Sequence, residues 1–237
     1  MTTAAVLDVR PLTARSAILS MLLGAHPPSA AGSEIVSWGL SIGISEPATR
    51  VALSRMVAAG DLERSAGSYA LAPRLVERQV RQDAALEQPQ KDWDGRWIVA
   101  VTTAVGNDAA TRATLRQHML AARFGELREG VWMRPNNLDW QAPPGVEVMI
   151  AEVGGSPRAF ADRLFDVDEW GARASQLLAA LDSGVGLKDR LAIAAAVVRH
   201  LTLDPLLPSA VLPDGWPARP LRDAYRNFQA GLLAARG

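Results

Sequence analysis

The sequence predicts an α+β protein with three parts: a small domain of helices and a hairpin, a central domain of strands and helices, and a helical C-terminal domain. Apolar residues recur at helical spacing between residues 12 and 59. Residues 61–71 (DLERSAGSYAL) alternate as a two-stranded hairpin does. Between residues 97 and 165, β-rich runs alternate with helical ones. A helical pattern then follows, and prolines interrupt it at residues 204–220.

The N-terminal region predicts three helices. Residues 12–24 (LTARSAILSMLLG) carry a helical stripe of apolar residues, and residues 33–40 (SEIVSWGL) predict a second helix. Ser45 can cap a third helix, which tolerates Pro47 in its first turn and ends at Gly60. We expect the apolar face of this third helix to consist mostly of small residues, namely Ala48, Val51, Ala52, Met56 and Ala59.

Three helices followed by a hairpin predict a winged helix-turn-helix, whose third helix reads the major groove of double-stranded DNA and whose hairpin is the wing. Arg50, opposite the expected apolar face, suits guanine edges or phosphate, although a solvated surface arginine is the alternative. Ser45 could equally be a helix cap, and Arg55 could pair with Asp61. The candidate DNA contacts are Arg15, Ser45, Thr49, Arg50, Ser54, Arg55, Arg64 and Ser68.

Composition excludes several classes of site. The chain carries 25 Lys and Arg against 25 Asp and Glu, so a nucleic-acid surface must be local. The absence of cysteine excludes disulfides, thiolate metal sites and cysteine nucleophiles. The three histidines have no metal-ligand spacing, and we expect no metal and no cofactor. The N-terminal residues lack the apolar core of a signal peptide, and the apolar runs are too short to cross a bilayer. We therefore expect a soluble, cytoplasmic protein with no membrane partner.

The central part predicts a ferredoxin-like domain. Its elements follow the order β-α-β-β-α, with strands near residues 97–103, 130–133 and 146–153 and helices near residues 107–123 and 156–165. A helix and a polar, proline-containing segment (EQPQKD) precede it and serve as a linker. The expected domains are therefore residues 1–72, 73–92, 93–166 and 167–237.

Four motifs, in this order along the chain, resemble the PaaX-like family of phenylacetic-acid catabolism repressors. They are GISEPATRVALSRMVAAGDL (43–62), WDGRW (93–97), FGELREGVWMRP (124–135) and DPLLPSAVLPDGWP (204–217). The resemblance implies a winged-helix domain, a central domain similar to the Cas2 nuclease fold and a helical C-terminal domain. It further implies a homodimeric repressor of an aromatic-acid degradation operon that an aryl-acyl coenzyme A releases from DNA.

Candidate ligand residues lie mainly in the central domain. Trp97 and Trp132 could stack on an aromatic acyl group or an adenine, and ordinary core packing is the alternative. The guanidinium groups of Arg96 and Arg134 match phosphate geometry, and structural carboxylates are their alternative partners. His200 is a weaker candidate ligand residue.

These observations predict a non-enzymatic, ligand-responsive regulator that binds an inverted-repeat operator as a homodimer. No catalytic residues are expected. The first alternative is a metal-dependent nuclease of the Cas2 type, for which Asp94 has only Asp92 as a close acidic neighbour. The second alternative is a protein-interaction module that uses the winged helix to bind protein.

Overall fold

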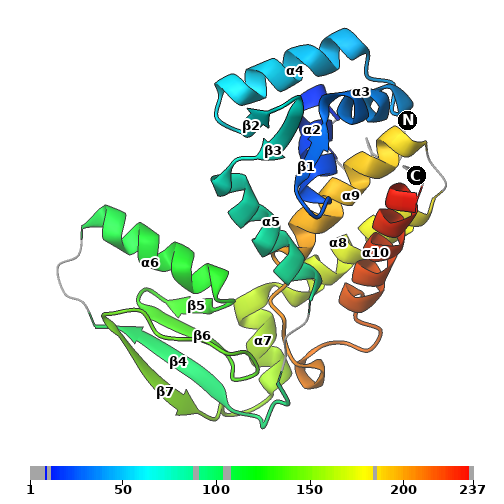
Figure 1. Ribbon diagram of the computed structural model, residues 1–237. Coiled ribbons are helices and arrows are strands. Elements are labelled where there is room, and N and C mark those ends of the chain that lie inside the picture. The colour runs from blue at the N-terminus through cyan, green and yellow to red at the C-terminus, as the bar shows by residue number, and fades with distance from the viewer. Residues whose placement is uncertain (1–8, 10–11, 88–90, 104–107, 184–185, 235–237) are drawn as a thin grey trace. The chain divides into compact units, whose positions relative to one another are not determined.

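The structure is a computed structural model that describes residue 9 and residues 12–87, 91–103, 108–183 and 186–234 (Figure 1). By its internal contacts the chain divides into two units. We call residues 1–87, 173–202 and 217–237 the N-terminal unit, and residues 88–172 and 203–216 the central unit. None of the helices in the described residues is long and apolar enough to cross a membrane.

The N-terminal unit begins with the three expected helices and the hairpin. Its first elements are α2 (Ala14–Leu23), β1 (Ser29–Ala31), α3 (Gly32–Ser41), α4 (Glu46–Ala58), β2 (Leu62–Ser65) and β3 (Ser68–Leu71). The strands form an antiparallel sheet in the order β1-β3-β2. The sequence did not indicate β1, because a strand of three residues is too short to show alternation.

Helix α4 is rotated about its axis relative to the expected orientation. Its buried residues are Thr49, Leu53 and Met56, whereas Ala48 and Val51 are exposed. Of the expected apolar face, Met56 is buried as predicted and Ala52 is half-buried, but Leu53 is buried in place of the other members because burying leucine removes more apolar surface from water than burying alanine. The hydroxyl of Thr49 can be buried because it donates a hydrogen bond to the carbonyl oxygen of Ser45 at 3.2 Å.

Two glycines allow α4 to sit where it does. A Cβ atom on Gly39 of α3 would lie 2.7 Å from the Oγ1 atom of Thr49, so the two helices approach closely only because this residue is glycine. Gly60 has a φ of +69° and reverses the chain after α4. The amide of Asp61 then donates to the carbonyl oxygen of Met56 at 2.8 Å and closes the helix end.

Helices from distant parts of the chain complete the N-terminal unit. They are α5 (Pro73–Leu86), α9 (Leu187–Leu201), α10 (Ala218–Ala234) and the residues of α8 (Val167–Asp182) from Arg173 onward. The carboxamide of Gln79 on α5 donates to the carbonyl oxygens of Leu23 and Ala25 at 3.0 and 2.8 Å. Gln229 on α10 donates to the carbonyl oxygen of Gly24 at 3.1 Å. The free carbonyls at the end of α2 are thus satisfied from two other helices.

The central unit contains an antiparallel sheet in the order β5-β6-β4-β7. Its elements are β4 (Trp97–Thr102), α6 (Ala109–Ala121), β5 (Gly125–Arg128), β6 (Val131–Pro135), β7 (Val146–Ala151) and α7 (Pro157–Phe165). A short 3-10 turn, η1, covers Ser209–Val211. The β-α-β-β-α order is present, with one additional strand. Strand β5 was missed because its sequence, GELR, is short and mostly polar.

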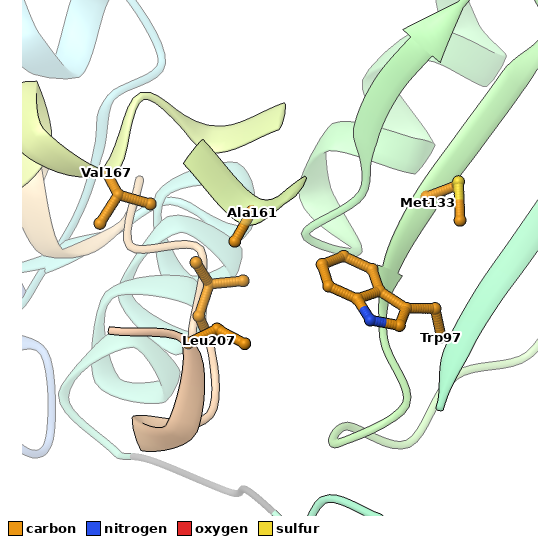
Figure 2. Packing of buried hydrophobic residues seen from close by; sticks show 6 residues of the cluster. Trp97, Met133, Ala161, Val167 and Leu207 are labelled. Carbon is orange, nitrogen blue, oxygen red and sulfur yellow. The ribbon is translucent and has the colours of Figure 1, made fainter. Parts of the chain in front are cut away.

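Each face of this sheet has its own core. Helix α6 lies over the face that carries Ile98, Ala100 and Trp132. On the opposite face the indole of Trp97 packs with Ala161 of α7 and with Leu207 (Figure 2). Residues 203–216, which the sequence assigned to the C-terminal domain, therefore cover the sheet. Edge strand β7 keeps apolar side chains about half exposed, namely Val148, Met149 and Ile150.

Candidate nucleic-acid interface

The outward surface of α4 carries two arginines. Because Thr49, Leu53 and Met56 point into the core, the 100° spacing of a helix places Val51 and Ser54 near the middle of the exposed side. By the same spacing, Arg50 and Arg55 lie on either side of these two residues, and both are exposed. The helix thus presents a polar and small-residue strip between two guanidinium groups.

The two arginines differ in their partners. The Nε atom of Arg50 donates to Oε1 of Glu46 at 2.7 Å, one turn earlier, and the Arg50 side chain is 67% exposed. Such exposed pairs contribute little, so a phosphate or a base could replace the carboxylate. Arg55 forms no ion pair with any residue that the structure describes. Its expected alternative partner, Asp61, is bound by other arginines.

Asp61 connects three helices just beyond α4. Its carboxylate is 2% exposed and accepts hydrogen bonds from Arg15 of α2, from Nε at 3.1 Å and from Nη2 at 2.7 Å. Arg74 of α5 binds its other oxygen, Oδ1. The structure therefore gives Arg15 a structural partner, although its side chain is 57% exposed. Sequence reasoning missed Asp61 as the shared partner of Arg15 and Arg74, because nothing in their spacing shows that both arginines face this carboxylate.

Other predicted contact residues fall into two groups. Ser45 caps α4, because its hydroxyl oxygen accepts from the amide of Ala48 at 3.4 Å. Thr49 is only 1% exposed and packs against Gly39, so it leaves the set of residues that could touch DNA. Ser54 is exposed on α4.

The hairpin presents the remaining polar candidates. Ala66 and Gly67 have positive φ values of 46° and 83°, as a tight two-residue hairpin turn requires. Ser68 is exposed next to this turn. The guanidinium of Arg64 lies 5.7 Å from the ring centre of Tyr69 on the neighbouring strand, and this stacking holds an exposed cation on the hairpin.

The expected ligand residues of the central unit do not form a site. Strand pairing aligns Ala100 with Trp132, so Trp132 shares the face covered by α6, whereas Trp97 lies on the opposite face. Trp97 is fully buried and meets Phe160 edge to face at 5.0 Å. The two tryptophans therefore belong to two separate cores and cannot stack on one ligand.

Arg134 and Arg96 are also engaged. Arg134 is 2% exposed and donates to the carbonyl oxygens of Ala122 and Leu138 at 3.3 and 2.6 Å. Burial lowers the pKa of Arg134 to about 10. Arg96 donates from Nε to Oδ2 of Asp94 at 2.6 Å, and this hydrogen bond lowers the pKa of Asp94. Burial therefore keeps Arg134 from a coenzyme A phosphate, whereas Arg96 forms an exposed pair with Asp94.

The remaining candidate residues are His200 and the acidic residue Asp94. His200 is partly exposed near the end of α9 in the N-terminal unit, and Arg96, Trp97, Trp132 and Arg134 belong to the central unit. Asp94, the candidate nuclease residue, is bound by Arg96. Among the described residues no cluster of three or more His, Asp or Glu side chains could hold a metal ion.

Two of the four motifs have structural roles in the central unit. In WDGRW, the indole of Trp93 donates to the carbonyl oxygen of Arg96 at 2.6 Å, around a turn at Gly95 with a φ of +89°. In DPLLPSAVLPDGWP, buried Asp204 accepts from the amide of Leu206 at 2.9 Å. These motifs therefore shape a turn before β4 and the segment that covers the sheet.

Comparison with known proteins relates the chain to one family. Residues 13–75 match the family model described as PaaX-like protein, and residues 90–154 match the model described as PaaX protein central Cas2-like domain. The uncharacterized protein Rv0674 from Mycobacterium tuberculosis has a solved structure similar to this one. It is 45% identical in sequence with a TM-score of 0.83, over 94% of this chain and 97% of that chain. None of the curated proteins compared with the chain matches it.

Proposed function

The chain belongs to the PaaX-like family, a family of transcriptional regulators, and we propose that it is a homodimeric repressor that binds an inverted-repeat operator through α4. The observation that carries this proposal is the exposed strip of α4 between Arg50 and Arg55. An α-helix fits the major groove of B-DNA, and guanidinium groups recognise guanine edges and phosphates.

The elements around α4 support a winged helix-turn-helix. Helices α2 and α3 pack against α4, and the β2–β3 hairpin follows it directly. In this arrangement the third helix enters the groove, while Arg64 and Ser68 on the hairpin reach the flanking backbone. Because the chain has no net charge, this local cluster of arginines supplies the attraction to phosphate.

A homodimer fits the way such domains read DNA. Two copies related by a twofold axis place two reading helices on half-sites about one helical turn apart. A dimer also needs apolar surface that a single chain leaves uncovered, and strand β7 provides such surface.

The proposed regulated genes encode the degradation of an aromatic acid or a related compound, and the proposed effector is of the acyl coenzyme A type. Both follow from the family. An effector can release DNA only if it binds the DNA-incompetent arrangement more tightly than the competent one.

Selection from a random pool of double-stranded DNA tests the function and requires no defined operator sequence. The full chain should enrich an inverted repeat, and its affinity for that repeat should fall steeply with salt. Arg55→Ala should weaken enrichment, whereas Arg81→Ala, an exposed arginine on α5, should preserve it. If the chain enriches no sequence and binds DNA independently of salt, the proposal is excluded. The alternative function, binding of another protein through the same surface, would then be favoured.

A further inference from the structure

The N-terminal unit contains a cavity that none of the expected ligand residues lines. Its volume is about 470 Å³, which lies in the range of small-molecule sites, roughly 300–1,000 Å³. Most of the residues that line it come from helices α2, α5, α9 and α10. The apolar part of the wall includes Leu19, Ala195, Val198 and Phe228.

The polar part of the wall favours an anion. Three arginines line the cavity, namely Arg78, Arg199 and Arg15, the last of which binds Asp61. Asp83 also lines it, but a ring nitrogen of His26 lies 3.0 Å from its Oδ2 atom. Arg78 pairs with no acid among the residues that the structure describes. Burial, with a smaller effect from Asp83, raises the pKa of Tyr225 to about 12, so its hydroxyl remains a neutral hydrogen-bond donor.

A second, larger cavity fits such a role less well. It measures about 710 Å³ and lies among α8, α9 and α10. Asp182 and Asp223 line it together with Arg190, so its charges favour no anion. It touches no residue of α2, α3 or α4. The smaller cavity, in contrast, includes Arg15, which binds Asp61 at the end of α4.

We propose that the smaller cavity binds a small organic anion with an apolar body, and that its occupation alters α4 through Arg15 and Asp61. The second clause rests on the proposed function, and the first does not. A free acid carries this charge on its carboxylate, whereas an acyl coenzyme A has a neutral acyl part and carries its negative charges on the coenzyme A phosphates. A ligand that contacts Arg15 changes the environment of the group that fixes Asp61, whose amide closes the last turn of α4.

Binding can be measured with 8-anilinonaphthalene-1-sulfonate, a fluorescent probe with apolar rings and one sulfonate. The full chain should enhance its fluorescence saturably. Ala195→Phe, which fills the cavity, should remove most of the enhancement, and Ser20→Leu on the facing helix α2 provides a second filling variant. Arg78→Gln should weaken binding roughly tenfold, the factor expected for one charge-assisted hydrogen bond. Arg81→Gln, on the same helix but outside the cavity, should bind as the parent chain does.

The outcomes separate the two clauses. Probe binding that is absent from the parent chain, or unchanged in a folded filling variant, would overturn the cavity as a ligand site. Equal affinities of Arg78→Gln and Arg81→Gln would overturn its preference for anions. A saturating probe should lower affinity for the selected DNA, and unchanged DNA affinity would overturn the coupling to α4. A chain that binds the probe through the cavity but binds no DNA would refute the proposed function alone.

A competition experiment identifies the source of the ligand. Phenylacetate and phenylacetyl coenzyme A are each titrated against the bound probe. Displacement by the free acid alone supports a small carboxylate as the ligand, and displacement by the thioester alone would show that the arginines bind a coenzyme A phosphate and not a small carboxylate. If neither displaces the probe, and a broader panel of aromatic and aliphatic carboxylates and their thioesters also fails, the proposed ligand class is wrong.

Discussion

The guanidinium of Arg15 on α2 binds the buried carboxylate of Asp61 at the start of the hairpin. Its Nε and Nη2 atoms donate hydrogen bonds of 3.1 and 2.7 Å to the Oδ2 atom. The other oxygen binds Arg74 on α5. This one side chain therefore fixes α2, α5 and the end of α4 relative to one another. A carboxylate this deeply buried is stable only while it is paired.

Replacing Asp61 should therefore destabilise the protein without touching the exposed strip of α4. We expect Asp61→Ala to lower the free energy of unfolding by about 2–4 kcal/mol, because two charge-assisted interactions are lost. Urea denaturation followed by circular dichroism measures this change. Asp92→Ala, an exposed acid in the central unit, is the control. A loss below about 0.5 kcal/mol, the size typical of an exposed pair, would contradict the assigned role of Asp61.

Arg50 should contribute to DNA binding directly. We expect Arg50→Ala to weaken binding to the selected DNA by about 1–3 kcal/mol, the typical contribution of one base contact. Folding should be unaffected because the side chain is exposed. A gel-shift titration measures the affinity, with Arg81→Ala as the control. Identical affinities of the folded Arg50→Ala and Arg81→Ala variants would remove Arg50 from the interface.

Glu46 should limit the affinity that Arg50 provides. Its carboxylate holds the Arg50 guanidinium at 2.7 Å and places a negative charge on the surface proposed to bind DNA. We expect Glu46→Gln to tighten DNA binding, with the largest effect at low salt. Fluorescence anisotropy at several salt concentrations measures this effect. In the Arg50→Ala variant, Glu46→Gln should tighten DNA binding less than it does in the parent chain. If Glu46→Gln weakens DNA binding in both the parent chain and the Arg50→Ala variant, the proposed role of Glu46 is wrong.

The close approach of α3 and α4 predicts a pair of coupled substitutions. Gly39→Ala should destabilise the chain by roughly 1–3 kcal/mol, because the new Cβ atom would lie 2.7 Å from Oγ1 of Thr49. Thr49→Ala removes that oxygen, so the double variant should recover part of the loss. A double-mutant cycle from thermal or urea unfolding gives the coupling energy. Strict additivity would show that the two helices separate instead of clashing.

The oligomeric state is testable without DNA. We expect a homodimer at micromolar concentration, because two reading helices must be held on two half-sites. Multi-angle light scattering reports the mass directly. A mass near 25.3 kDa, the mass of one chain, both with and without the selected DNA, would contradict the dimer.

Local patterns predicted the helices and the hairpin well, and they failed where the outcome depends on packing between distant segments. Ser45, Pro47 and Gly60 mark the ends of α4 because capping depends on neighbours in sequence. The packing of α2 and α3 decides which face of α4 is buried. The buried face contains Leu53 and not the alanines. A threonine hydroxyl predicts an exposed position. The hydroxyl of Thr49 is nevertheless buried, because it donates a hydrogen bond to the carbonyl oxygen of Ser45.

The predicted ligand site failed for a related reason. Arginine and tryptophan near one another in sequence resemble a site for an aromatic anion, but the register of β4 against β6 places Trp97 and Trp132 on opposite faces of the sheet. Trp97 and Trp132 thus fill different cores, and Arg134 donates to main-chain carbonyls under Phe124. The cavity in the N-terminal unit combines residues from four helices, and no local pattern brings Arg78 together with Ala195.

The bond from Gln229 to the carbonyl of Gly24 joins residues 205 positions apart in the chain, and this has a consequence for biosynthesis. Ribosomes add about 5–20 residues per second, and N-terminal domains commonly fold while the rest of the chain is being made. Here α2 and its partners remain without α9 and α10 until the ribosome has added about 200 further residues after α2. A premature stop codon upstream of α10 would therefore yield a chain in which the helices proposed to read DNA lack part of their own core.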